Sequence, residues 1–272
     1  MEKVSKFFKI IQTLICKPNS LLRVLNTDDI YRKKVSNKFS SFSNGFPVVD
    51  IVDLFPDLNE TIHHGFLEGT SFPLDMVLLK KCAQRFTDCV FLEIGTWRGE
   101  SVANVSPFAK ECFTLNLSAE EMRAMDLPED RIASLDFFSK DFKNVKHIKA
   151  NSHSFDFNSL GKKFDLIYID GYHKYEDVKK DTEVLLPFLK DEKSIMIWHD
   201  AVFTSGEMRW EVMAAILDSV PKEKQKHLYY VSNTLCAIYI PEQLRTESFN
   251  LYGKPSKVFE VNIRAKTINN RQ

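Results

Sequence analysis

An excess of charge of either sign is missing from this sequence of 272 residues. Lysine plus arginine equals aspartate plus glutamate, with 37 of each. A balanced chain offers no broad electrostatic field that would attract a polyanion, and its charge runs are short and mixed. We therefore expect no nucleic-acid partner.

Patterned cysteines and long apolar runs are missing as well. The five cysteines are scattered without a CxxC pair, so a metal or redox pair is not expected, and a reducing cytoplasm is the predicted location. The apolar run over residues 7–15 contains Lys9 and Gln12 and is far shorter than the ~20 residues of a membrane-spanning helix. It also lacks the cleavage site of a signal peptide. We interpret it as an amphipathic helix that packs on the domain or in a homo-oligomer, with membrane-surface contact as the less favoured alternative.

The chain divides into three predicted parts. Residues 1–69 are predicted to form an N-terminal helical extension followed by an irregular lid. Residues 70–240 form the main domain, which begins with a helix capped by Thr70 or Ser71. Residues 241–272 form a polar tail.

Short apolar runs in the main domain are typical of strands. They cover residues 89–95, 112–117, 145–150, 164–170, 193–199, 228–231 and 235–240. Helical patterns separate most of these runs, and strands that are apolar on both faces indicate a parallel sheet covered by helices. Only three residues join the last two runs, which is short enough for a hairpin, so the sheet is expected to be mixed at one edge.

The first predicted strand ends in a turn with two glycines. The sequence Glu93-Ile94-Gly95-Thr96-Trp97-Arg98-Gly99-Glu100-Ser101 passes from strand through turn to helix. In open α/β sheets ligands bind at the carboxyl ends of strands, and glycines let the backbone approach a ligand closely. The third glycine of a dinucleotide motif is missing, which disfavours NAD.

The second and third strands end in amides. Asn116 lies about twenty residues beyond the glycine turn, where an acid usually binds ribose hydroxyls. An amide binds a hydroxyl less strongly than a carboxylate does, and a simple turn residue is an equally good interpretation. Asn151 and Ser152, after the third strand, are placed to meet an adenine edge.

Acids and imidazoles follow the next two strands. The fourth strand ends in Asp170-Gly171-Tyr172-His173, and the fifth ends in His199-Asp200. Neighbouring parallel strands lie ~4.8 Å apart, so these side chains should open onto one pocket. Such a set suits a divalent cation or proton transfer.

These motifs together resemble a family of class I S-adenosylmethionine-dependent methyltransferases. The resemblance rests on EIGTWRGES, NSHSFDF, FDLIYIDGYHKYEDVKKD and IMIWHD, and it covers roughly residues 71–240. It implies a Rossmann-like, doubly wound α/β fold whose seven-stranded, mostly parallel sheet carries an antiparallel strand at one edge. Asn116 and Asn151 depart from the acids common in the family.

The resemblance also implies a cofactor, a reaction and a set of site residues. S-adenosylmethionine would donate a methyl group to a hydroxyl of a small molecule or sugar, and Mg²⁺ or another divalent cation is a further expected cofactor. The expected cofactor-binding residues are Glu93, Gly95, Thr96, Trp97, Gly99, Ser101, Asn116, Leu117, Asn151, Ser152, Asp170 and Tyr172. The expected catalytic residues are His173, Asp170 and Asp200, and the expected metal ligands are Asp170, His199 and Asp200.

In this interpretation the cation lowers the pKa of the acceptor oxygen. His173 then takes the proton as general base. Two alternatives stay open. One is an inactive protein that binds S-adenosylmethionine, which the amide at Asn116 keeps open, and the other is an NAD-dependent oxidoreductase.

Overall fold

The computed structural model describes Ile11, residues 27–254 and residues 256–267. The predicted helix over residues 7–15 lies outside this range, apart from Ile11, which is helical. In the part of the chain that the structure describes, no helix combines the length and apolar character that crossing a bilayer requires.

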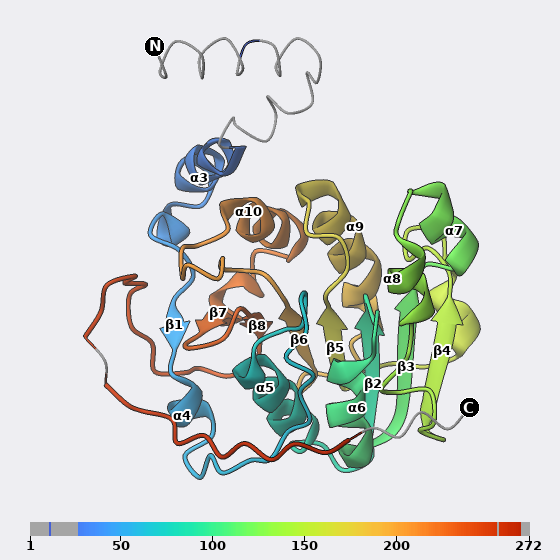
Figure 1. Cartoon of the computed structure of the whole chain (residues 1–272). Helices are drawn as coiled ribbons and strands as arrows, with labels where there is room; N and C mark the ends of the chain where they lie inside the picture. Colours follow the sequence, from blue (N-terminus) through green and yellow to red (C-terminus); the bar gives the residue numbers. More distant parts are fainter. Residues whose placement is uncertain (1–10, 12–26, 255, 268–272) are drawn as a thin grey trace, which may run out of the picture.

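One eight-stranded sheet forms the centre of the molecule (Figure 1). Its strand order is β1-β7-β8-β6-β5-β2-β3-β4. The strands are β1 (Val48–Val49), β2 (Cys89–Ile94), β3 (Ala109–Asn116), β4 (Val145–Lys149), β5 (Leu166–Ile169), β6 (Ile195–Trp198), β7 (Leu228–Val231) and β8 (Ala237–Tyr239). Only β8 runs antiparallel to its two neighbours, β6 and β7, so the predicted mixed, mostly parallel sheet is confirmed.

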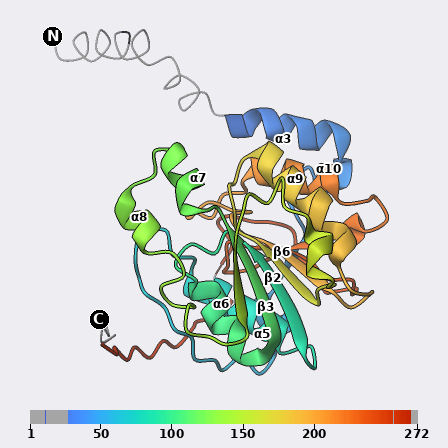
Figure 2. The ribbon, with the colours of Figure 1, turned by 90° about the vertical axis from the view of Figure 1, so that its right-hand side faces the viewer.

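Helices cover both faces of the sheet (Figure 2). The helices are α3 (Thr27–Lys38), α4 (Ile51–Leu54), α5 (Pro73–Ala83), α6 (Glu100–Val105), α7 (Ala119–Ala124), α8 (Glu129–Ala133), α9 (Tyr175–Leu185) and α10 (Trp210–Ser219). Short 3-10 turns add η1 (Ser40–Phe42), η2 (Ser106–Phe108), η3 (Phe157–Leu160), η4 (Leu186–Phe188) and η5 (Gln225–His227). One face carries α3, α9 and α10, and the other carries α4, α5 and α6.

Strand residues alternate between two hydrophobic clusters. Ile167 and Ile169 of β5 belong to the cluster under α9 and α10, whereas Leu166 and Tyr168 belong to the cluster under α5 and α6. All four are buried. This alternation is the period-2 pattern of a strand that is covered on both faces.

The predicted lid contributes an eighth strand to the sheet. β1 pairs in parallel with β7, with Val48 opposite Tyr230, so the sheet exceeds the seven strands expected. β8 therefore lies within the sheet, between β7 and β6, and β1 forms the edge on that side. The tail also reaches this edge, because Val48 N donates to Glu247 O at 2.9 Å.

The cap predicted for the first domain helix was wrong. α5 begins at Pro73, so Phe72 rather than Thr70 or Ser71 is its N-cap. Proline fits the first helical position and keeps the residue before it extended. The Asp75 carboxylate accepts the backbone N–H of Phe72 at 2.7 Å, which stabilises this helix start.

Candidate active site

The glycine turn after β2 lies directly against the end of β5. Gly95 has a φ of +95°, and a Cβ built on it would lie 2.0 Å from the carbonyl oxygen of Asp170. Only glycine permits both the positive φ and this approach. β5 in turn neighbours β6, which ends in His199 and Asp200. The structure therefore brings together the ends of the three strands that carry Gly95, Asp170 and Asp200.

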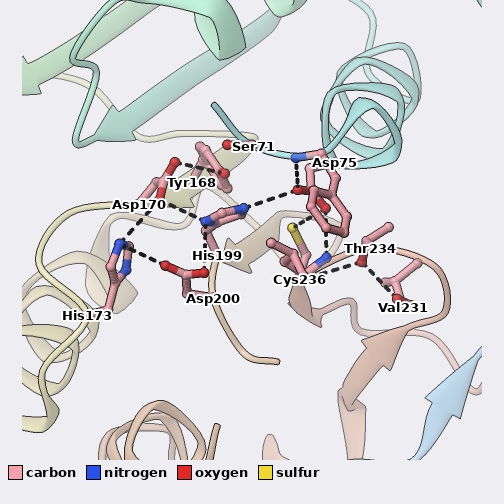
Figure 3. A network of polar contacts seen from close by, with 12 residues as sticks. Ser71, Asp75, Tyr168, Asp170, His173, His199, Asp200, Val231, Thr234 and Cys236 are labelled. Atoms are coloured by element: carbon pink, nitrogen blue, oxygen red, sulfur yellow. Dashed lines mark hydrogen bonds and ion pairs between the residues drawn. The ribbon is translucent and has the colours of Figure 1, made fainter. Parts of the chain in front are cut away.

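A chain of ionisable side chains crosses this end of the sheet (Figure 3). His199 Nδ1 lies 3.0 Å from Asp170 Oδ1, and His199 Nε2 lies 3.1 Å from Asp75 Oδ2. Tyr168 donates its hydroxyl to Asp170 Oδ2 at 3.1 Å. Burial lowers the pKa of His199, but the charges and contacts of Asp170 and Asp75 raise it well above its ordinary value. This buried histidine is therefore held by carboxylates on both sides.

His173 and Asp200 form a second, more accessible pair. His173 Nε2 lies 2.9 Å from Asp200 Oδ2, and Arg209 Nη1 lies 3.3 Å from the same oxygen. Burial raises the pKa of Asp200, but the contact with His173 and the charges of His199 and Arg209 outweigh it and lower the pKa to about 2. Asp200 therefore stays ionised and fixes one ring nitrogen of His173.

Asp75 is the member of this site that the sequence did not reveal. It lies in the first turn of α5, where an acid is ordinary, and it is 124 residues from His199. Its carboxylate is fully buried, and it also accepts Leu235 N at 2.8 Å. A fully buried acid is unusual, but the burial shows only once α5 is seen against β6 and β8.

Glu93, the second-last residue of β2, is a buried carboxylate with one oxygen free of hydrogen bonds among the described residues. Ser101 donates to its Oε1, while Oε2 has no hydrogen-bond partner among the described residues. Burial raises the pKa of Glu93 to about 7, against the effect of the Ser101 hydrogen bond. Thr96 shares a hydrogen bond with Thr114 on the neighbouring strand. An unpartnered buried oxygen of this kind suits a cationic ligand group.

Trp97 stands at the rim of the glycine turn. Its φ is +39°, and its ring lies between two guanidinium groups, with Arg98 at 3.8 Å and Arg131 at 4.3 Å from the ring centroid. Gly99, two residues further on, has a φ of +78°, and a Cβ there would lie 2.1 Å from Ser139 Oγ. Both residues therefore shape the turn through packing.

The remaining predicted residues differ in how free their side chains are. Within the described part of the chain, the Asn116 side chain makes only long contacts, to Leu117 O at 3.5 Å and Met122 Sδ at 3.9 Å. The Asn151 side chain accepts His153 N at 2.9 Å within its own turn. Ser152 follows it in the same turn, and Tyr172 is largely exposed. Asn116 is thus the freest of these polar groups, whereas the Asn151 side chain stabilises its loop.

The predicted metal ligands do not fit a divalent cation as they are arranged. Among the described residues, no group of three or more His, Cys, Asp and Glu side chains is placed to hold a metal ion. Both ring nitrogens of His199 face carboxylates, so neither offers a lone pair. The acids face His199, His173 and Arg209 instead. We therefore derive no catalytic step through a metal.

Comparison with known proteins gives one family match. Residues 92–201 match the family model described as "Methyltransferase domain", a segment that runs from β2 to the residue after Asp200. The resemblance predicted from the sequence is thereby confirmed for this segment. Comparison with the curated proteins gives no match.

Solved structures similar to this chain include two methyltransferases. One is a putative caffeoyl-CoA O-methyltransferase from Staphylococcus aureus, with 19% identity, a TM-score of 0.45, and coverage of 63% of this chain and 84% of that chain. The other is CalS11, a TDP-rhamnose 3'-O-methyltransferase of calicheamicin biosynthesis, with 14% identity, a TM-score of 0.44, and coverage of 61% and 77%. At such scores they add nothing about substrate.

Proposed function

From the methyltransferase fold around residues 92–201, we propose that this protein transfers a methyl group from S-adenosylmethionine to a hydroxyl of a small molecule, with sugars as the first class to test. One observation carries the proposal. The glycine turn at Gly95 abuts Asp170, and the His173–Asp200 pair lies at the same end of the sheet. The proposed site for the methyl donor and the proposed proton acceptor, His173, are therefore next to each other.

Free polar groups support a cofactor site at the ends of β2 and β3. Glu93 Oε2 would accept the ammonium group of the methionine part, and the Asn116 amide would face the ribose. Asn151 and Ser152 would lie near the adenine. Because the Asn151 side chain is already hydrogen-bonded within its turn, this loop would contact the adenine through its backbone. When bound, the cofactor supplies an electrophilic methyl group on a sulfonium.

His173 is the proposed general base. Its Nε2 faces Asp200, so this nitrogen carries the hydrogen and Nδ1 carries the lone pair. The bond from the acceptor oxygen to the methyl carbon forms as the bond from sulfur to that carbon breaks, and the hydroxyl proton passes to Nδ1. Displacement of this kind depends on alignment and on a positioned base.

Two binding measurements and one assay test the proposal. Calorimetric titration should show binding of S-adenosylhomocysteine and no binding of NAD. Incubation with labelled S-adenosylmethionine and a panel of sugars, phenols and amines should then label a hydroxyl-bearing acceptor. Binding of NAD alone would favour an oxidoreductase, and cofactor binding without transfer to any acceptor class would favour an inactive binding protein.

Glu93→Gln should separate stability from cofactor affinity. The folded pKa of Glu93 is about 7, against 4.5 for an ordinary glutamate. The folded protein therefore binds this proton more tightly, and the associated stability is complete below pH 4.5 and is lost as the pH rises through 7. Removing the ionisable group should stabilise the ligand-free protein at pH 8 by up to about 3 kcal/mol.

The same substitution should weaken S-adenosylhomocysteine binding about tenfold, because the ammonium group loses a charged partner. Thermal unfolding at pH 5 and pH 8, combined with calorimetry, measures both effects. A melting temperature of Glu93→Gln that equals wild type at pH 8 would contradict the assigned pKa, and an unchanged affinity would contradict the ligand role.

A further inference from the structure

His199 contacts Asp170 and Asp200, the two carboxylates expected from the sequence to bind a metal. Its Nδ1 is 3.0 Å from Asp170 Oδ1 and 3.7 Å from Asp200 Oδ1. The side chain is 8% exposed, and Figure 3 shows the ring between the side chains of Asp170 and Asp75. One ring nitrogen of His199 therefore lies near both of these carboxylates.

The opposite ring nitrogen faces a third carboxylate. His199 Nε2 lies 3.1 Å from Asp75 Oδ2. The Asp75 carboxylate accepts hydrogen bonds from the backbone N–H groups of Phe72 at 2.7 Å and Leu235 at 2.8 Å, which fix its position. The Cys236 thiol also points at it, at 3.6 Å. The acid that holds His199 is thus positioned by two separate segments, the start of α5 and the connection between β7 and β8.

This geometry determines the charge of the ring. Carboxylates only accept hydrogen bonds, so a ring nitrogen that faces one at hydrogen-bonding distance must carry a hydrogen. The Nδ1 contact is an ion pair rather than an aligned hydrogen bond, but a lone pair there would face the lone pairs of Asp170. Both nitrogens of His199 therefore carry hydrogens, which makes the ring an imidazolium.

We propose that His199 is a built-in cation, held by Asp75, that supplies at the acceptor site the positive charge that a divalent metal supplies in metal-dependent methyltransferases. The catalytic role proposed for His199 rests on the proposed function, whereas the charge of its ring does not. His199 acts as a positioning residue, because it fixes Asp170 and Asp200 rather than touching the methyl group. Methyl transfer by this protein then requires no metal.

The three carboxylates of the site already face positively charged or hydrogen-bonding side chains of this protein. Asp75, Asp170 and Asp200 supply the negative charges. His199 lies between the first two, while Arg209 and His173 both contact Asp200. Adding a dication would place it within contact distance of an imidazolium, which Coulomb repulsion disfavours in a buried site. A cation site should therefore open only when the ring is removed.

The test is a titration of the full-length protein with Mn²⁺ in the presence of S-adenosylhomocysteine. Wild type should show no stoichiometric site, and EDTA should leave its turnover unchanged. In the double variant Asp75→Asn/His199→Asp, a third carboxylate replaces the ring, and one Mn²⁺ should bind with a Kd of about 1 mM or tighter. Asp75→Asn alone keeps the ring and serves as the matched control, with no gain in binding.

Each outcome decides the proposal. Stoichiometric Mn²⁺ binding by wild type that Asp170→Asn abolishes would overturn it. Absence of binding by a folded double variant would also overturn it, because the ring would then not occupy a place that can hold a cation. If the double variant does not fold, nitrogen-15 NMR of wild type at a pH two units above the ordinary pKa of histidine decides. Two protonated ring nitrogens on His199 support the proposal, and one lone pair refutes it.

Failure of the proposed function would look different. Wild type would then bind no S-adenosylhomocysteine in the same calorimetric cell, while the NMR signals of His199 would still report the charge of the ring. A protein that binds the cofactor but shows a neutral His199 would retain the proposed function and lose only the built-in cation.

Discussion

His173→Gln should lower kcat by about 10²–10⁴-fold, the range that a positioned general base contributes. Glutamine keeps the polarity and much of the volume of the side chain but cannot accept a proton near neutral pH. The affinity for S-adenosylhomocysteine should stay within about twofold, because His173 Nε2 lies closest to Asp200, at 2.9 Å, and is 4.0 Å from Asp170. Steady-state kinetics with an acceptor found by the labelling assay, together with calorimetry, measure both quantities.

The control for this prediction is His227→Gln. His227 lies in η5, before β7, and its Nδ1 contacts only the carbonyl of Glu242 at 3.1 Å. This variant should retain wild-type kcat. If His173→Gln kept its kcat too, another group would take the proton and the assignment of the base would be wrong. If both kcat and cofactor affinity fell together, His173 would act through the fold of the site.

The parts of the site that could be predicted from the sequence are those whose positions depend only on neighbouring residues in the chain. A buried strand followed at once by a polar residue places that residue at the edge of the sheet, so Asp170 and Asp200 were assigned to one region from their positions alone. The glycine turn was predictable for the same reason. Each pattern gives the position of a residue along one strand. Because parallel strands have their carboxyl ends at the same edge of the sheet, that position is enough to place these residues near one another.

Contacts between distant elements could not be predicted in this way. Asp75 has the sequence context of any acid in the first turn of a helix, and only the packing of α5 against the sheet makes it a partner of His199. The arrangement of the expected metal ligands could not be predicted for the same reason. His199 looked like a ligand when β6 was considered alone, but Asp75 occupies its second nitrogen.

The edge strand β1 could not be predicted from the sequence for a similar reason. β1 has two residues, which is too short to produce the alternating pattern by which strands are recognised. Its pairing with β7 depends on a neighbour that comes some 180 residues later. The core strands were predictable because burial on both faces gives each of them a continuous apolar run, as for Leu166–Ile169.

Gly95→Ala should disrupt both the fold and the cofactor site. The added Cβ would lie 2.0 Å from the carbonyl oxygen and 2.4 Å from the carbonyl carbon of Asp170, and both are backbone atoms that cannot rotate away. The φ of +95° adds backbone strain. Left-handed strain of about 1–2 kcal/mol and overpacking of about 1–3 kcal/mol together predict a loss of about 2–5 kcal/mol in the free energy of unfolding.

Relief of this clash would push the end of β2 away from β5, and the cofactor turn would separate from Asp170. Binding of S-adenosylhomocysteine should therefore fall by more than the loss of stability alone explains, even at a temperature where the variant stays folded.

Gly161→Ala is the matched control. Gly161 also has a positive φ, +59°, but a Cβ there would meet nothing within 4 Å. It should lose only the strain energy and keep wild-type affinity. Equal losses of stability and affinity in the two variants would mean that the close approach of Gly95 to Asp170 does not hold the site together.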